Sequence, residues 1–266
     1  MNILDEIVAY KRIEVKEQKS RIPFKALEQT SLFERKILSL EDSLKNTSKT
    51  SIITEFKKKS PSRGIINDEA TPELVTKGYA DAGAAGLSVL TDNKYFGGSP
   101  EDLIKAREVN EIPILRKDFT VDEYQIIQSK AIGADAILLI AACLSNQQLK
   151  EFARTAKSLG LQVIMEIHKL SELSLLNEFV DIVGVNNRNL KTFEVDINTS
   201  IELIKHIPSE FVRISESGIS SARNIIKLRE CGYDGFLIGE FFMKEKDPVK
   251  AFIKFVRKLE TDNKNE

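Results

Sequence analysis

The stretch from Ile52 to Gly64 places an acid and three consecutive lysines directly after a short apolar run. The β-branched residues that begin at Ile52 are typical of a buried strand. Side chains alternate along a strand, so Glu55 and Lys57 share one face if the strand continues that far. A carboxylate beside an ammonium can move protons and hold a polar substrate. The alternative interpretation is a solvated lysine cluster that flanks a strand.

Polar side chains follow later strand-like runs in the same way. Lys117 and Phe119 alternate after one run, and Glu166 comes directly after the apolar Val-Ile-Met of another. A carboxyl group in that place should be partly buried, with a raised pKa suited to proton transfer. Asn186 and Arg188 follow a further run. These residue types indicate general acid–base chemistry on a polar substrate.

Each of these residues also has a structural interpretation. Lys117 precedes Asp118, and a surface ion pair between them would contribute little to stability. In this interpretation, Glu166 pairs with a neighbouring lysine for structure alone, and Asn186 and Arg188 cap a turn. His168 lies one alternation beyond Glu166, where a structural role at the strand exit is the better interpretation.

Glycines in the last two expected loops indicate a phosphate site. Ser217 and Gly218 follow the seventh expected strand, and Gly239 and Glu240 follow the eighth. Glycine lets backbone N–H groups approach an anion, and this corner of many barrels holds a phosphate. Ser60 can complete the cradle, because the first strand of a barrel neighbours the eighth. The Glu240 carboxylate should then point away from the phosphate, while the backbone of Glu240 contributes to the phosphate site.

Strand-like runs alternate with amphipathic helical stretches from residue 51 onward. Runs such as 136–142 and 181–185 are apolar at consecutive positions, which is typical of parallel strands covered on both faces. The first 45 or so residues look helical and show no strand pattern. The expected strands are 51–55, 86–91, 112–117, 134–141, 162–167, 181–186, 211–216 and 235–239. The expected helices include 71–82, 122–131, 146–158, 170–177, 200–207 and 221–230.

Eight strand–helix units in roughly 210 residues match the size and rhythm of a TIM barrel. A doubly wound sheet is the alternative, but its G-x-G-x-x-G turn after the first strand is absent from the sequence. We therefore expect one domain, an α/β protein with a single (β/α)8 TIM barrel at 48–266 and an N-terminal helical extension at 1–47 packed on it. In this fold the site forms where the strands end, which brings the polar residues to one rim.

Composition and charge exclude several classes of protein. The 266 residues are 42% apolar and 30% charged, with a net charge of −1, so the chain is not wholly disordered and has no basic field for nucleic acid. No apolar stretch approaches the roughly 18–20 residues of a membrane span, and the N-terminus lacks a signal-peptide layout. We expect a cytoplasmic protein. Cys143 and Cys231 stand outside any Cys/His cluster, so we expect no metal site.

A series of motifs, taken in order, resembles the indole-3-glycerol phosphate synthase family of tryptophan biosynthesis. They are E-F-K-K-K-S-P-S, L-S-V-L-T-D, F-G-G-S, I-L-R-K-D-F, V-N-N-R-N-L, S-E-S-G-I and F-L-I-G-E, and I-L-D-E-I-V-A-Y-K-R resembles the family's extension. The resemblance implies a barrel without metal or organic cofactor. It also implies conversion of 1-(2-carboxyphenylamino)-1-deoxyribulose 5-phosphate to indole-3-glycerol phosphate, with loss of carbon dioxide and water.

The resemblance assigns roles to the polar residues. Lys117 would protonate the ketone oxygen during ring closure. Glu166 and Lys57 would share the acid and base work of dehydration, with Glu55 orienting Lys57, and Asn186 would position the departing hydroxyl. The substrate-binding residues that the resemblance implies are Ser60, Phe119, Arg188, Glu216, Ser217, Gly218, Leu237, Gly239 and Glu240.

Three alternatives stay open from the sequence. A related phosphate-binding barrel, such as phosphoribosylanthranilate isomerase, would more naturally use a Cys or Asp pair and would lack the extension. A non-catalytic barrel that binds a phosphorylated metabolite would not need the proton-transfer set. An aldolase would use a Schiff-base lysine. As partners we expect a small phosphorylated substrate, no nucleic acid and no membrane, in a monomer or weak homo-oligomer.

Overall fold

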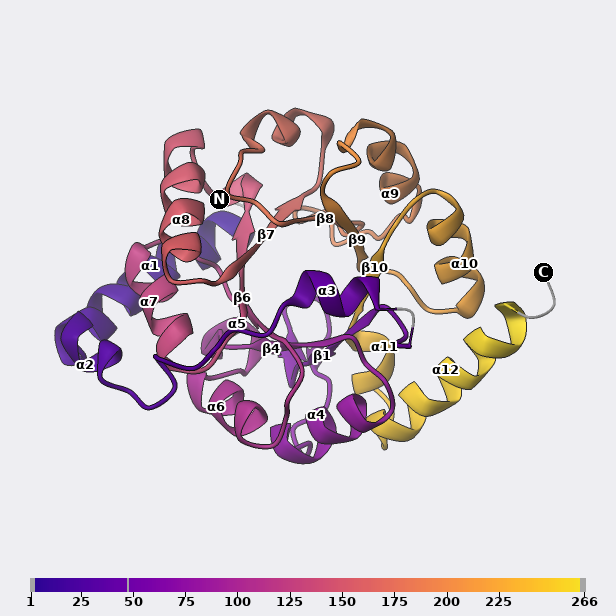
Figure 1. The fold of residues 1–266 in the computed structure, drawn as a ribbon, viewed down its shortest axis with the longest axis horizontal. Coiled ribbons are helices and arrows are strands. Elements are labelled where there is room, and N and C mark those ends of the chain that lie inside the picture. Colours follow the sequence, from indigo (N-terminus) through magenta and orange to yellow (C-terminus); the bar gives the residue numbers. More distant parts are fainter. Residues whose placement is uncertain (1–2, 47, 264–266) are drawn as a thin grey trace.

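A closed barrel of eight parallel strands forms the centre of the computed structural model, which describes residues 3–46 and 48–263 (Figure 1). Strands that follow one another in the chain lie side by side, and the last pairs with the first. The predicted strands are confirmed, with bounds that differ by two residues at most. The barrel strands are β1 (Ile52–Phe56), β4 (Gly86–Leu90), β5 (Ile114–Lys117), β6 (Ala136–Ile140), β7 (Gln162–Ile167), β8 (Ile182–Asn186), β9 (Val212–Glu216) and β10 (Gly235–Ile238).

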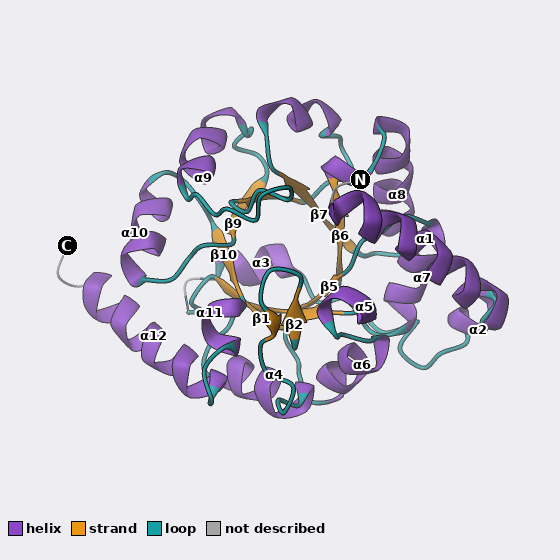
Figure 2. Ribbon diagram, turned by 180° about the vertical axis from the view of Figure 1, so that it is seen from behind, coloured by secondary structure: helices purple, strands orange, loops and turns teal. Residues whose placement is uncertain are grey.

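Helices surround the barrel in the intervals between its strands (Figure 2). Asp122 and Ser145 each begin a helix with a reciprocal capping box, which satisfies backbone N–H groups at the helix start. The longer helices of this ring are α4 (Pro72–Asp81), α6 (Pro100–Glu108), α7 (Glu123–Ala131), α8 (Asn146–Ser158), α9 (Asn198–Leu203), α10 (Ala222–Glu230) and α12 (Pro248–Asn263), and the short turns α5 (Asn93–Phe96) and α11 (Glu240–Met243) lie at strand ends.

Two connections differ from the expected pattern. The helix predicted at 170–177 is wrong in type, because Leu170–Leu175 forms 3-10 turns in which the Ser174 hydroxyl donates to the Ser171 carbonyl at 2.8 Å. Serine side chains that bond the local backbone compete with a regular helix. After β1 the chain forms an unpredicted antiparallel hairpin of β2 (Lys59–Ser60) and β3 (Gly64–Ile65).

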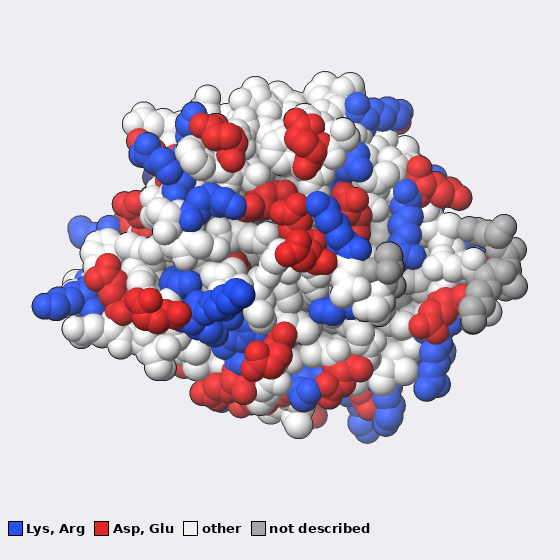
Figure 3. Space-filling view, in the orientation of Figure 1, with Lys and Arg blue, Asp and Glu red and all other residues white. Residues whose placement is uncertain are grey.

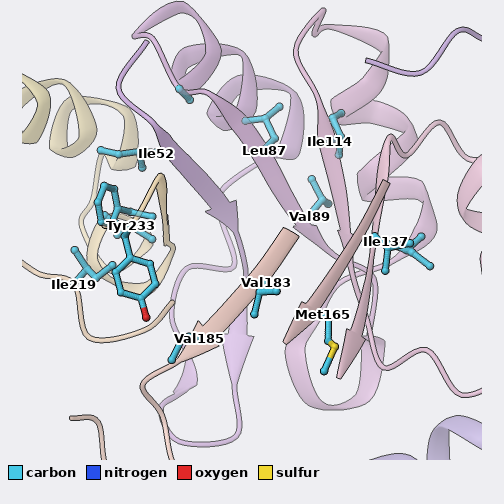
Figure 4. Close-up of a cluster of buried hydrophobic side chains, with 14 of the residues drawn as sticks. Ile52, Leu87, Val89, Ile114, Ile137, Met165, Val183, Val185, Ile219 and Tyr233 are labelled. Atoms are coloured by element: carbon cyan, nitrogen blue, oxygen red, sulfur yellow. The ribbon is translucent and has the colours of Figure 1, made fainter. Parts of the chain in front are cut away.

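Apolar side chains fill both faces of the barrel wall. Ile52 points outward into the layer between strands and helices, whereas its neighbour Ile53 points into the barrel. Figure 4 shows the outer layer, with Leu87 and Ile114 on the neighbouring strands β4 and β5. Burial on both faces explains the consecutive apolar residues from which the parallel strands were predicted.

The N-terminal segment reaches both ends of the barrel. It contains α1 (Ile3–Arg21), α2 (Phe24–Glu28) and α3 (Leu40–Lys45). Figure 1 shows α3 across one mouth, and α1 lies on the opposite side, nearer the viewer in Figure 2. A Cβ on Gly86 would lie 2.6 Å from Leu40 Cδ1, so α3 is seated closely on the strand starts. The boundary predicted at residue 47 lies outside the described residues.

Charged side chains of both signs are interspersed over the face that α3 closes (Figure 3). This face therefore presents no extended patch of a single sign. In the part of the chain that the structure describes, no helix combines the length and the apolar character needed to cross a membrane.

A buried carboxylate ties the N-terminal segment to the barrel. Asp135, directly before β6, is fully buried and accepts hydrogen bonds from Arg35 Nη2 at 2.6 Å and Arg107 Nη1 at 2.8 Å. It also accepts the backbone N–H groups of Leu38 and Ile114, each at 2.8 Å. These bonds compensate for burying the charge. Asp135 therefore joins the segment before α3 to two neighbouring strands, at the end of the barrel that α3 closes.

We predict that Asp135→Ala lowers the free energy of unfolding by about 3–5 kcal/mol, because it leaves buried guanidinium groups without their partner. Urea unfolding measures this loss. Asp81→Ala is the matched control, since Asp81 pairs with Lys77 on the exposed surface of α4 and such pairs contribute little. A loss below about 1 kcal/mol for Asp135→Ala would contradict this role.

Candidate active site

A cavity of about 720 Å³ opens at the carboxyl ends of the barrel strands. Inward-facing positions change from apolar to polar there: Ile53 is followed by Glu55, and Ile164 by Glu166. The cavity brings together every residue that was predicted for the site. These lining residues are Glu55, Lys57, Ser60, Lys117, Phe119, Glu166, Asn186, Arg188, Glu216, Ser217, Gly218, Leu237, Gly239 and Glu240.

The Lys117 ammonium lies between two carboxylates on the cavity floor. Its Nζ is 3.1 Å from Glu166 Oε2 and 3.9 Å from Glu216 Oε2. The lysine side chain is 16% exposed and both carboxylates are almost fully buried. The alternative of a surface pair with Asp118 is wrong, because Asp118 instead lies 3.0 Å from the ammonium of Lys11. Lys117 is therefore directed into the cavity.

Burial and neighbouring charges act on the pKa values of this group. Burial alone would lower the pKa of Lys117, but Glu166, Glu216 and Glu55 outweigh it and raise that pKa. Burial would raise the pKa of Glu166, yet Lys117 and His168 bring it below its usual value. The raised pKa predicted for Glu166 is therefore wrong.

The raised carboxyl pKa belongs to Glu216 instead. Burial and then the Glu166 charge raise the pKa of Glu216 to about 8. The two buried carboxylates repel one another, so only one of them ionises readily. Near neutral pH the floor therefore holds the Lys117 ammonium, the Glu166 carboxylate and a protonated Glu216.

Asn186 contacts Glu166 from the next strand. Its Nδ2 donates to Glu166 Oε1 at 3.2 Å, and its Oδ1 accepts the backbone N–H of Arg188 at 3.0 Å. The turn-capping interpretation of Asn186 is thus confirmed together with its place beside the acid. His168 Nε2 lies 3.3 Å from the same Glu166 oxygen, at the exit of β7 as expected.

Two glycines make room for the buried carboxylates. Lys57 Nζ lies 2.7 Å from Glu55 Oε1, which confirms the contact expected from their alternation. A Cβ on Gly239 would collide with the Glu55 carboxylate, and one on Gly184 would collide with that of Glu216. Sequence reasoning missed Gly184, although a glycine inside an apolar strand often marks such a close approach.

The loop after β9 has a tight and well-supported backbone. Ser217 and Gly218 have φ values of 66° and 76°, and serine adopts this left-handed region only rarely. The Asn187 amide donates to the carbonyls of Glu216 and Ser217, each at 3.0 Å. These bonds hold the serine in its strained conformation, as is common at functional sites.

Arginines and a buried serine surround the start of α11. The Glu240 carboxylate accepts from Arg63 Nε at 3.1 Å and from Arg188 Nη2 at 3.4 Å. Ser60 is buried on the neighbouring hairpin. Positive side chains, a hydroxyl and the glycine loops therefore gather at one corner of the cavity. Arg63, which also lines it, was missed because it follows the turn rather than the strand.

The sequence comparisons assign the family. A family model described as "Indole-3-glycerol phosphate synthase" matches residues 4–256. The chain belongs to this family. A relative of that name from Bacteroides thetaiotaomicron is 45% identical over 97% of this chain and 99% of its own length. Another, from Laribacter hongkongensis, is 42% identical over 94% of this chain and 97% of its own length. The predicted resemblance is confirmed, and the chain is an enzyme of the carboxy-lyase class.

Solved structures support the fold. The alpha subunit of tryptophan synthase from Legionella pneumophila has a TM-score of 0.60 with 14% identity, over 85% of this chain and 97% of that chain. At this identity the likeness concerns the barrel alone. Among residues 3–46 and 48–263, no cluster of histidine, cysteine, aspartate or glutamate side chains is arranged to hold a metal ion.

The family's N-terminal extension contributes to the cavity wall, which was not predicted. Ile3, Leu4 and Ile7 of α1 line the cavity beside Phe96. The helical spacing of Ile3 and Ile7 was visible in the sequence, but it does not show which surface the apolar face of a helix covers. Further lining residues that sequence reasoning missed are Leu138, Ile140, Phe193, Val195, Phe241 and Lys244.

The raised pKa of Glu216 predicts a pH dependence of stability. Between the ordinary pKa of 4.5 and about 8, the folded protein keeps a proton that the unfolded chain releases. Rising pH in this window therefore lowers the free energy of unfolding. We predict that Glu216→Gln removes this pH dependence, whose total size is about 1.4 kcal/mol for each unit of pKa shift. Urea unfolding of the wild type and of Glu216→Gln at several pH values measures this pH dependence. If the free energies of unfolding of the two proteins ran parallel from pH 4 to 9, the assignment would be contradicted.

Proposed function

We propose that the cavity converts 1-(2-carboxyphenylamino)-1-deoxyribulose 5-phosphate to indole-3-glycerol phosphate, carbon dioxide and water. The observation that carries this proposal is the charged Lys117 between Glu166 and Glu216, on the floor of a cavity with two unlike sides. Family membership supports the substrate, since the related proteins carry the product in their name. It also favours this reaction over the isomerase, aldolase and binding-barrel alternatives.

The topology places unlike surfaces opposite one another. In the closed strand order β9 stands across the barrel from β5, and β10 from β6. Phe119, after β5, packs its ring 6.0 Å from that of Phe96. Gly218 and Gly239 follow β9 and β10. We place the aromatic ring of the substrate on the phenylalanine side and its phosphate on the glycine side, where Ser60 completes the cradle. The reacting carbons then lie above Lys117.

Ring closure is assigned to Lys117. The ring carbon that bears the carboxylate attacks the ketone carbon, and the ketone oxygen takes a proton from the Lys117 ammonium. Carbon dioxide then leaves, and the electron pair of the broken bond restores the aromatic ring. The Glu166 carboxylate beside Lys117 keeps it charged, so it can stabilise the developing oxyanion before the proton moves.

Dehydration is assigned to Glu166 and Lys57. One acid protonates the departing hydroxyl, and one base removes a proton from the ring that is forming. The Glu55 carboxylate orients the Lys57 ammonium at 2.7 Å. Asn186, bonded to Glu166 at 3.2 Å, positions the hydroxyl. Substrate contacts are assigned to the remaining lining residues Arg188, Glu216, Ser217, Leu237 and Glu240, the last through its backbone.

We also propose that this chemistry needs no metal or organic cofactor, because lysine and glutamate side chains supply both acid and base. We place the protein in the cytoplasm, as a single-domain monomer or weak homo-oligomer without a nucleic-acid partner. The net charge of −1 and the interspersed charges on the face in Figure 3 support the absence of a nucleic-acid partner.

A fluorescence assay for the indole product tests the function directly. The purified protein is mixed with 1-(2-carboxyphenylamino)-1-deoxyribulose 5-phosphate in the presence of EDTA. We expect turnover that EDTA leaves unchanged. A folded protein that binds the substrate without forming product would contradict the proposed function, and loss of turnover in EDTA would contradict the metal-free chemistry.

We predict that Lys117→Met lowers kcat by at least about 100-fold, because a positioned proton donor is worth about 10²–10⁴-fold. The same fluorescence assay measures turnover, and circular dichroism verifies the fold. Lys169→Met is the matched control, since Lys169 is exposed on the loop after β7 and does not line the cavity. Near-normal turnover by Lys117→Met would remove it from the mechanism.

A further inference from the structure

A fully buried lysine connects the N-terminal helix to the barrel. Lys11 of α1 is 1% exposed, and its ammonium lies 2.9 Å from Asp92 Oδ2 and 3.0 Å from Asp118 Oδ1. Glu14 of the same helix is also 2.9 Å away. Burying a charge is costly unless it is paired, and losing one partner of such a group is strongly unfavourable. The cluster therefore fixes α1 to the loops after β4 and β5.

The acids that bind this lysine also position two aromatic residues of the cavity. Asp92 Oδ1 accepts the N–H groups of Tyr95 at 2.8 Å and Phe96 at 3.2 Å, which begins the short turn α5. Asp118 Oδ1 accepts the N–H of Phe119 at 2.8 Å. Phe96 and Phe119 both line the cavity, with ring centroids 6.0 Å apart. The ion cluster thus lies directly behind the aromatic side of the site.

The same helix supplies further apolar residues to the cavity wall. Ile3, Ile7 and Lys11 are spaced four residues apart, so they follow one stripe of α1. Ile3 and Ile7 line the cavity with Leu4, whereas Lys11 is not among the lining residues. A smaller contact supports the arrangement, since the Tyr95 hydroxyl donates to Glu6 at 2.9 Å. Seating Lys11 on the barrel therefore places the apolar residues of α1 over the cavity.

Lys11 and Asp118 stabilise one another's charged form. Burial alone would lower the pKa of Lys11, but Asp118, Asp92 and Glu14 raise it above its usual value. Burial would raise the pKa of Asp118, which Lys11 and Arg116 bring below its usual range. The ion pair between Lys11 and Asp118 is thus charged at neutral pH.

We propose that Lys11 is a positioning residue that holds α1 against Asp92 and Asp118 and so completes the apolar compartment for the aromatic ring of the substrate. The identity of that ring rests on the proposed function. Lys11 acts through the wall it positions and does not touch the reacting atoms. Its loss should weaken binding of the ring, while the phosphate corner at the loops after β9 and β10 is unchanged.

The experiment compares Lys11→Met, Lys11→Arg and the control Lys16→Met, which changes an exposed lysine of the same helix. For Lys11→Met we expect KM for the carboxyphenylamino substrate to rise at least 10-fold, with kcat within about 3-fold of wild type. The inhibition constant of inorganic phosphate should be unchanged in Lys11→Met. Lys11→Arg keeps the positive charge, so its KM should return most of the way to the wild-type value. Hydrogen exchange should become faster at amides 3–10 in Lys11→Met alone.

Two outcomes for the folded variant would overturn the proposal. An unchanged KM and unchanged exchange in folded Lys11→Met would mean that Lys11 does not position the wall. If phosphate inhibition weakened as much as substrate binding, the substitution would have distorted the whole site rather than one wall. If Lys11→Met does not fold, the double variant Lys11→Met with Asp92→Asn takes its place. It removes one charge of each sign, and asparagine can still cap α5. The KM of this double variant for the carboxyphenylamino substrate then decides. Failure of the wild-type enzyme to form the indole product would instead contradict the proposed function, and the exchange measurement would still judge Lys11.

Discussion

The placement of one ammonium among buried carboxylates is the constraint on which the site depends. Lys117 lies 3.1 Å from Glu166 and 3.9 Å from Glu216 inside a barrel whose other inward positions are largely apolar. A lone charge there would be costly, and paired charges are tolerated only with close contacts. Gly184 provides the space for the Glu216 carboxyl group and Gly239 the space for that of Glu55, since a side chain at either glycine would collide with it. The same crowding divides the acids into one ionised and one protonated group.

The two ends of the barrel have different tasks. At one end a buried charge network around Asp135 attaches the N-terminal segment to the strand starts. Leu40 and Leu44 of α3 also pack there, against Gly86 and Gly235. At the other end strand termini carry polar groups, and α1 lies over them through Lys11. The N-terminal segment thus contributes stability at one mouth and a cavity wall at the other. This division agrees with the general pattern of these barrels, in which the carboxyl ends of the strands carry the chemistry.

The barrel was predictable because its strands are apolar on both faces and alternate with amphipathic helical stretches. Strand alternation was also enough to bring Glu55 to Lys57, and topology to bring Lys117 to Glu166, residues far apart in the chain. The pKa of Glu166 was predicted in the wrong direction because the prediction considered burial alone, whereas the charges of Lys117 and His168 outweigh burial in the structure. The wall formed by α1 could not be predicted, since an amphipathic pattern gives a face without its partner. For the same reason the cluster around Lys11 is invisible in sequence.

A crystal structure with a substrate analogue whose ketone is reduced to an alcohol tests the central claim most directly, because this analogue cannot close the ring. We predict that the alcohol oxygen lies within hydrogen-bond distance of Lys117 Nζ, about 3 Å. We also predict the phosphate between the loops after β9 and β10, and the aromatic ring against Phe96 and Phe119. A phosphate bound elsewhere, or a Lys117 ammonium that contacts only Glu166 and Glu216 while the alcohol lies beyond its reach, would contradict the central claim.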